Sequence, residues 1–136
     1  MNDGVDFVIV VDAMEHSPGF LRLTQEARAR IRETTCETIR QRQLRGERFL
    51  LVDVREDHEW QQGHITGAVH LGKGILERDI ERIVPDHATD MVLYCGGGYR
   101  SALSADAIKQ MGYTNVVSMY GGWKRWTELG YPTENT

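Results

Sequence analysis

Residues 91–101 read Met-Val-Leu-Tyr-Cys-Gly-Gly-Gly-Tyr-Arg-Ser, and this stretch carries the clearest structural signal in the chain. The apolar run 91–94 is typical of a parallel strand that is buried on both faces. Cys95 and the three glycines then turn the chain. Residues 101–111 have the composition of a helix, and Gly112 is well placed to end it. A strand, a tight turn and a helix in this order predict one unit of an α/β fold.

Further runs of the same kind lie on both sides of this stretch. Three more short strands are expected, at residues 49–54, 69–71 and 116–119, and a last helix at residues 122–129. Alternating strands and helices predict an α/β domain with a mainly parallel central sheet and helices on both faces.

The N-terminal part of the chain is expected to add two helices. Ser17-Pro18 is typical of a helix start, with a capping hydroxyl before a proline at the first helical position. Thr34 and Glu37 form a capping-box pattern that predicts a second helix to about residue 44. We therefore divide the chain into an extension at 1–30, with a strand-like run and a helix packed on the domain, and a domain at 31–136.

Length and charge exclude several classes of protein. The chain has 136 residues, enough for one domain with its own hydrophobic core. It carries 16 Lys and Arg against 20 Asp and Glu, a net charge of −4, which disfavours nucleic-acid binding. The apolar run 7–11 is too short to span a membrane and lacks the flanks of a signal peptide. Two cysteines give no disulfide framework, so a reducing, cytoplasmic location is expected.

The glycine-rich turn has the residues of a nucleophilic site. Ligands of open α/β sheets bind at the carboxyl ends of the strands, and glycines let successive backbone N–H groups point toward an anion. At a helix N-terminus this field would lower the pKa of the Cys95 thiol. Arg100 would add a fixed positive charge, and Ser101 would either cap the helix or hydrogen-bond the sulfur. Cys95 is therefore the candidate catalytic residue, and the candidate substrate-binding residues are Gly96, Gly97, Gly98, Tyr99, Arg100 and Ser101.

Each of these features alone has a plain structural explanation. A glycine-rich turn is often only a turn, and a buried cysteine usually behaves as a small apolar residue. The combination of cysteine, glycines, arginine and helix start after a buried strand favours a functional site.

The chain resembles the rhodanese family across about residues 31–132. Three sets of residues carry this resemblance in the family's order: Asp53-Val54-Arg55-Glu56 with Glu59-Trp60 and residues 63–70; residues 94–101; and Gly112-Tyr113 with Gly121-Gly122-Trp123 and residues 126–132. The spacing from Cys95 to Arg100, Cys-x4-Arg, resembles the loop of active sulfurtransferases. Related phosphatases and arsenate reductases carry a longer loop.

The resemblance implies a rhodanese-like fold and a thiosulfate sulfurtransferase that works through a Cys95 persulfide. Its partners would be a small anionic sulfur donor and a thiol or cyanide acceptor, with a sulfur-relay protein as a further candidate. No cofactor and no metal are implied. Two other functions stay open: a phosphatase or arsenate reductase that uses the same cysteine, and a non-catalytic interaction domain.

The remaining polar residues are interpreted mainly as structural. Asp53, Arg55 and Glu59 are expected to form an ion-pair cluster that anchors the loop after the strand at 49–54. We favour this structural role over a catalytic one, because structural ion pairs commonly imitate functional charge clusters. His64 and His70 lack the local spacing of a zinc site and are also read as structural.

Three further interpretations concern other residues of the chain. Lys73, Arg78 and Arg82 follow the strand at 69–71 and are candidates for a basic pocket rim, with a solvated face as the alternative. Trp123 and Trp126 are expected in the core. Cys36 is read as a bystander, with a resolving thiol as the alternative.

Overall fold

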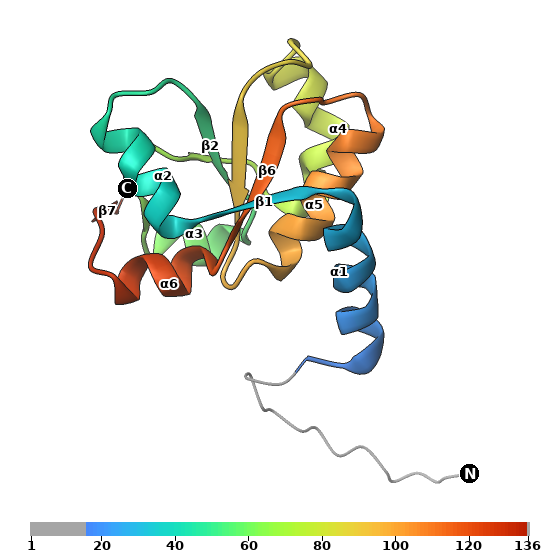
Figure 1. The fold of residues 1–136 in the computed structure, drawn as a ribbon, viewed down its shortest axis with the longest axis horizontal. Coiled ribbons are helices and arrows are strands. Elements are labelled where there is room, and N and C mark those ends of the chain that lie inside the picture. Colours follow the sequence, from blue (N-terminus) through green and yellow to red (C-terminus); the bar gives the residue numbers. More distant parts are fainter. Residues whose placement is uncertain (1–15, 136) are drawn as a thin grey trace, which may run out of the picture.

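The computed structural model describes residues 16–135. The strand-like run expected in the N-terminal extension, at residues 5–11, lies outside them. A five-stranded parallel sheet forms the centre, in the order β1-β6-β5-β2-β4 (Figure 1). Its strands are β1 (Arg32–Thr35), β2 (Leu50–Asp53), β4 (Val69–His70), β5 (Met91–Tyr94) and β6 (Val116–Tyr120). Two short strands, β3 (His64–Ile65) and β7 (Thr133–Glu134), pair antiparallel beside it. The prediction of an α/β fold with a mainly parallel sheet is confirmed.

Helices cover both faces of this sheet. They are α1 (Pro18–Arg30), α2 (Cys36–Leu44), α3 (Asp57–Gln61), α4 (Lys73–Ile83), α5 (Tyr99–Gln110) and α6 (Gly122–Glu128). One hydrophobic core contains side chains of α4 and α5, and the other contains side chains of α2 and α6. No helix within residues 16–135 is long and apolar enough to cross a bilayer.

Strand β5 lies in the middle of the sheet, between β2 and β6. All four of its side chains are buried, because it has a neighbouring strand at each edge and a core on each face. This position explains why its sequence is continuously apolar instead of alternating. It also places Cys95, the next residue, at the carboxyl edge of the sheet's centre.

The start of α2 differs from the prediction by one residue. Thr35, not Thr34, caps this helix, and its hydroxyl oxygen accepts a hydrogen bond from the Thr38 N–H at 3.1 Å. Thr34 instead lies in β1, where it pairs with Met119. Strand β1 is polar and forms an edge of the sheet, so its sequence lacks the apolar pattern of the other strands.

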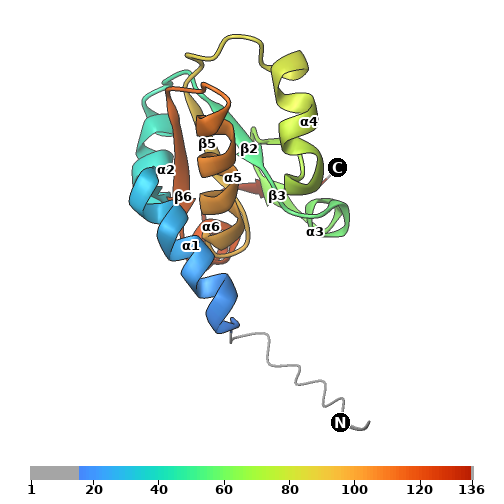
Figure 2. The same cartoon turned by 90° about the vertical axis from the view of Figure 1, so that its right-hand side faces the viewer.

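Helix α1 begins after Ser17 as predicted, but the Ser17 side chain makes no capping hydrogen bond. The helix packs along α5, on the outside of the sheet (Figure 2). Arg30, its last residue, donates two hydrogen bonds to the Asp106 carboxylate on α5, at 2.7 and 3.0 Å. Leu23 of this helix is half exposed.

Candidate active site

The glycine-rich turn forms a compact loop between β5 and α5, here called the cysteine loop (residues 95–101). Helix α5 begins at Tyr99, two residues earlier than predicted. Gly98 precedes it with a φ of +103°, and a Cβ at that position would lie 3.2 Å from the Gly121 nitrogen. Only glycine combines this conformation with so close an approach of two backbones.

The Cys95 sulfur is surrounded by hydrogen-bond partners. It accepts from the backbone N–H groups of Gly98, at 3.1 Å, and of Ser101, at 3.3 Å. The Ser101 hydroxyl lies 3.5 Å from the sulfur and 2.8 Å from the Ser118 hydroxyl of β6. Of the two roles considered for Ser101, the contact with the sulfur is therefore the one found, since Gly98 occupies the cap position.

The outer side of the cysteine loop is held by the N-terminus of α6. The Trp123 N–H donates to the Cys95 carbonyl at 2.8 Å, and the Lys124 N–H donates to the Gly96 carbonyl at 3.0 Å. A Cβ on Gly122 would lie 2.3 Å from the Cys95 carbonyl oxygen, so this close contact requires glycine. The carbonyls of the loop thus face α6, while N–H groups face the sulfur. Sequence reasoning did not foresee this contact.

Arg100 forms a two-point ion pair with Glu59 of α3, with nitrogen–oxygen distances of 2.7 and 3.0 Å. The hydrogen bonds from Arg100 lower the pKa of Glu59 to about 2, and the same contact raises the pKa of Arg100. The expected cluster of Asp53, Arg55 and Glu59 is therefore only partly right. Arg55 does pair with Asp53, in a fully buried bidentate contact. Glu59, however, pairs with Arg100 of the cysteine loop.

The two tryptophans of α6 have different environments. Trp126 is fully buried, as expected. Trp123 is only partly buried, and the Arg55 guanidinium lies 4.7 Å from the centre of its ring. Trp123 packs against the core that contains Trp126 and also lines a cavity, so its expected place in the core is partly confirmed.

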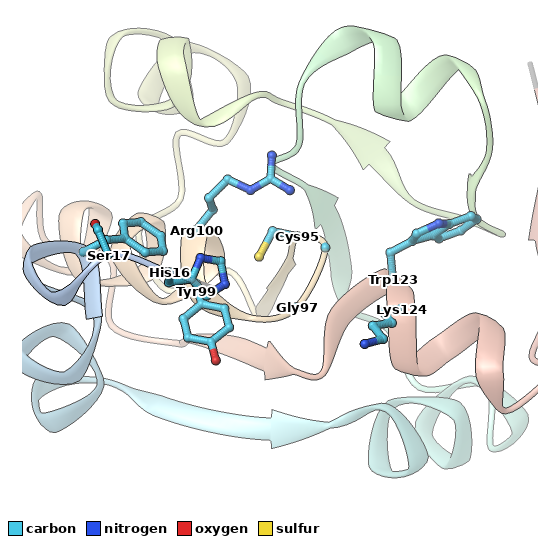
Figure 3. Close-up of a pocket in the computed structure, with 10 residues that line it drawn as sticks. His16, Ser17, Cys95, Gly97, Tyr99, Arg100, Trp123 and Lys124 are labelled. Carbon is cyan, nitrogen blue, oxygen red and sulfur yellow. The ribbon is translucent and has the colours of Figure 1, made fainter. Parts of the chain in front are cut away.

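A cavity of about 860 Å³ opens above Cys95 (Figure 3). Its walls come from the cysteine loop, from α6 and from the start of α1. The lining residues are His16, Ser17, Phe20, Cys95, Gly96, Gly97, Tyr99, Arg100, Trp123 and Lys124. The part contributed by α1 was not predicted, because no sequence pattern connects residues 16–20 with the loop.

The other candidate residues lie elsewhere. Lys73, Arg78 and Arg82 do not line this cavity, and Arg78 forms an ion pair with Asp79 on the same helix. The predicted basic rim is therefore wrong. Its alternative fits Arg78 and Arg82, whose side chains are largely exposed.

The two histidines considered as metal ligands stack on one tryptophan. The ring centres of His64 and His70 lie 3.5 and 5.0 Å from that of Trp60. Among residues 16–135, no group of three or more His, Cys, Asp or Glu side chains is arranged to hold a metal ion.

Cys36 lies in the core on the other face of the sheet from Cys95. It is fully buried, and this burial raises the pKa of its thiol to about 11. A thiol in this state is a poor nucleophile, which supports its reading as a bystander.

Comparison with known proteins identifies the class to which this fold and site belong. Residues 36–129 match the family model of the rhodanese-like domain, and the chain belongs to that family.

Individual relatives agree with this assignment. The chain is 36% identical over 91 residues to the thiosulfate sulfurtransferase GlpE of Pseudomonas entomophila, covering 67% of this chain and 81% of that protein. It is 28% identical over 104 residues to YrkF of Bacillus subtilis, whose name as a sulfur carrier protein is provisional. That match covers 76% of this chain but only 55% of the length of YrkF.

A solved structure from Rhodopseudomonas palustris resembles most of this chain. It has a TM-score of 0.78 and 28% identity, and the match covers 96% of this chain and 100% of that one. That protein is described as being of unknown function and as a possible tyrosine phosphatase.

Proposed function

We propose that this chain is a sulfurtransferase that carries sulfane sulfur as a persulfide on Cys95. The observation that carries the proposal is the sulfur itself, which faces a cavity and accepts two backbone N–H hydrogen bonds at the end of the central strand. Such donors stabilise negative charge on a thiolate and on the outer sulfur of a persulfide. The sulfurtransferases among the relatives support the same assignment.

The transfer would take place in two steps. The Cys95 thiolate attacks the outer sulfur of thiosulfate, the sulfur–sulfur bond of the donor breaks, and sulfite leaves with the electron pair. A thiolate or cyanide then attacks the outer sulfur of the persulfide. The bond within the persulfide breaks, and Cys95 regains its thiolate. No cofactor takes part in either step.

The other residues of the cysteine loop would bind the donor. Gly96, Gly97, Gly98, Tyr99 and Ser101 offer backbone N–H groups, and Arg100 offers a cation that an anionic donor would share with Glu59. A sulfur-relay protein as acceptor and a cytoplasmic location are parts of this proposal.

A phosphatase is the second candidate, favoured by the description of the Rhodopseudomonas structure. It would use Cys95 as the nucleophile and the same loop to hold a phosphate ester. The short spacing between Cys95 and Arg100 argues for the smaller sulfur instead.

Intact mass spectrometry distinguishes these functions. After incubation with thiosulfate, wild type should gain the mass of one sulfur atom and lose it on addition of cyanide. The Cys95→Ser variant should show no gain. Absence of any gain with thiosulfate and with an organic persulfide would overturn the proposal. Hydrolysis of p-nitrophenyl phosphate that depends on Cys95 would then favour the phosphatase.

A further inference from the structure

The cavity above Cys95 is larger than a small inorganic anion needs. Its volume of about 860 Å³ lies in the range of roughly 300–1,000 Å³ that is usual for sites of organic ligands. Thiosulfate would fill only a small part of this space. The residues that line the rest of the cavity therefore indicate which larger ligand the site accepts.

One wall is aromatic and is formed by His16, just before α1, by Phe20 of α1 and by Tyr99 at the start of α5. The ring of His16 lies 5.2 Å from that of Phe20 and 4.4 Å from that of Tyr99, centre to centre. Phe20 and Tyr99 are 6.1 Å apart. These separations are those of packed aromatic rings, so the three side chains form one continuous surface. Figure 3 shows His16 and Tyr99 on one side of Cys95.

This wall is fixed to the cysteine loop by a cation between two rings. The Arg28 guanidinium of α1 lies 4.9 Å from the centre of the Tyr99 ring and 5.1 Å from that of Tyr120. It also pairs with Glu33, at 3.2 Å. Because Arg28 contacts the loop's own tyrosine, the position of α1 relative to Cys95 is defined.

The opposite wall combines an aromatic ring with a positive charge. Trp123 and Lys124 of α6 lie across Cys95 from His16 (Figure 3). Lys124 is exposed, and within the described part of the chain no carboxylate lies within salt-bridge distance of it. A ligand in the cavity would thus meet apolar surface on two sides and a cation at one edge.

We infer that the acceptor of this site is an organic thiol with an aromatic or similarly apolar body and a carboxylate, and that Phe20 determines this preference. The inference rests on the proposed sulfur transfer and names the acceptor class of the same site. The apolar body would lie against Phe20 and Tyr99, the carboxylate near Lys124, and the sulfur above Cys95.

The step is a simple displacement. The acceptor loses its proton to solvent, and its thiolate attacks the outer sulfur of the Cys95 persulfide. A new sulfur–sulfur bond forms in the organic persulfide product. The bond between the two persulfide sulfurs breaks, and its electron pair stays on Cys95.

The test uses the full chain with thiosulfate as donor and two acceptors, 4-(mercaptomethyl)benzoate and 2-mercaptoethanol. In a two-step transfer, kcat/KM for the acceptor reports only the second half-reaction. Wild type should have the higher kcat/KM for 4-(mercaptomethyl)benzoate. Phe20→Ala should reduce the ratio of kcat/KM for this acid to kcat/KM for 2-mercaptoethanol by roughly tenfold, as expected for loss of one apolar wall. Phe20→Leu should give an intermediate ratio.

Leu23→Ala is the matched control, because Leu23 lies on the same helix, is half exposed and does not line the cavity. It should leave the ratio unchanged. Equal values for the two acceptors in wild type, or an unchanged ratio in Phe20→Ala, would overturn the inference.

Binding of 4-methylbenzoate to the unloaded protein, followed by Trp fluorescence, separates this inference from the proposed function. Binding that weakens in Phe20→Ala but not in Leu23→Ala supports the cavity even if no sulfur transfer is found. Absence of sulfur loading in wild type would count against the transfer alone, and absence of binding would count against the cavity alone.

Discussion

Arg100 and Glu59 face each other through two parallel hydrogen bonds, at 2.7 and 3.0 Å, and so join the cysteine loop to the first turn of α3. The Glu59 carboxylate also accepts the Glu56 N–H at 3.0 Å, which fixes its orientation. The Arg100 cation is therefore already paired. An anionic donor that bound there, as we propose, would have to share Arg100 with the Glu59 carboxylate.

This pair predicts a stability difference that depends on pH. The pKa of Glu59 falls from an ordinary 4.5 to about 2 in the folded chain. A depressed carboxyl pKa stabilises the fold fully above the unfolded value and loses that effect as pH falls through the folded value. The difference in unfolding free energy between wild type and Glu59→Gln should therefore be constant above about pH 5.5 and shrink between about pH 4.5 and 2.

Urea unfolding at a series of pH values measures this difference. Glu77→Gln is the control, since Glu77 is exposed on α4 and has no ion-pair partner among the described residues. A difference that stays constant down to pH 2 would show that Arg100 and Glu59 do not pair in solution.

Ser101 and Ser104 lie one turn apart on α5, and both are buried, but only Ser101 has hydrogen-bond partners. Ser101→Ala would leave the Ser118 hydroxyl without its partner and should lower the unfolding free energy by about 1–3 kcal/mol. Ser104→Ala should cost nothing or slightly stabilise, because alanine is the better helix former. Equal losses in the two variants, measured by chemical denaturation, would contradict this account.

Gly122 tolerates no side chain in its present backbone conformation. Its φ is +53°, and a Cβ would lie 2.3 Å from the Cys95 carbonyl oxygen. Gly122→Ala should destabilise the fold by roughly 1–3 kcal/mol and reduce sulfur loading, because α6 can no longer hold the cysteine loop.

Gly74→Ala provides the comparison for this substitution. Gly74 lies in α4 with nothing within 4 Å of the added Cβ. Its replacement should be neutral or stabilise by about 0.5–1 kcal/mol. Thermal unfolding of both variants, with sulfur loading by mass spectrometry, tests the pair of predictions, and a stable, fully loaded Gly122→Ala would refute them.

Cys36 should play no part in sulfur transfer. Its thiol is buried, its pKa is raised to about 11, and it lies on the opposite face of the sheet from Cys95. Cys36→Ala should therefore gain one sulfur from thiosulfate and return it to cyanide as wild type does. A persulfide that forms but is not released in this variant would revive the resolving-thiol alternative.

Local sequence predicted the centre of the fold well, because burial there leaves a direct pattern. Met91–Tyr94 is apolar throughout, and the glycines that follow mark the turn. Strand β1 was missed for the opposite reason. Its residues, Arg32–Thr35, lie at an exposed edge of the sheet and are polar. The same composition is also typical of residues that precede and cap a helix, so it does not predict a strand.

The contacts that complete the site could not be read from the chain. Closeness in sequence favours a pair between Glu59 and Arg55, whereas Glu59 pairs with Arg100, 41 residues away. Likewise, Phe20 joins the cavity only because α1 packs along α5. Such contacts depend on the packing of whole elements, which residue spacing does not encode.

The hydrogen bonds from α6 to the carbonyls of Cys95 and Gly96 have a wider consequence. The direction in which the peptide units of the loop point is imposed by a segment more than twenty residues downstream. Residues 95–101 transplanted into another strand–helix turn would keep their side chains and lose this restraint. The backbone geometry around Cys95 is therefore a property of two chain segments together, and a short motif match reports only one of them.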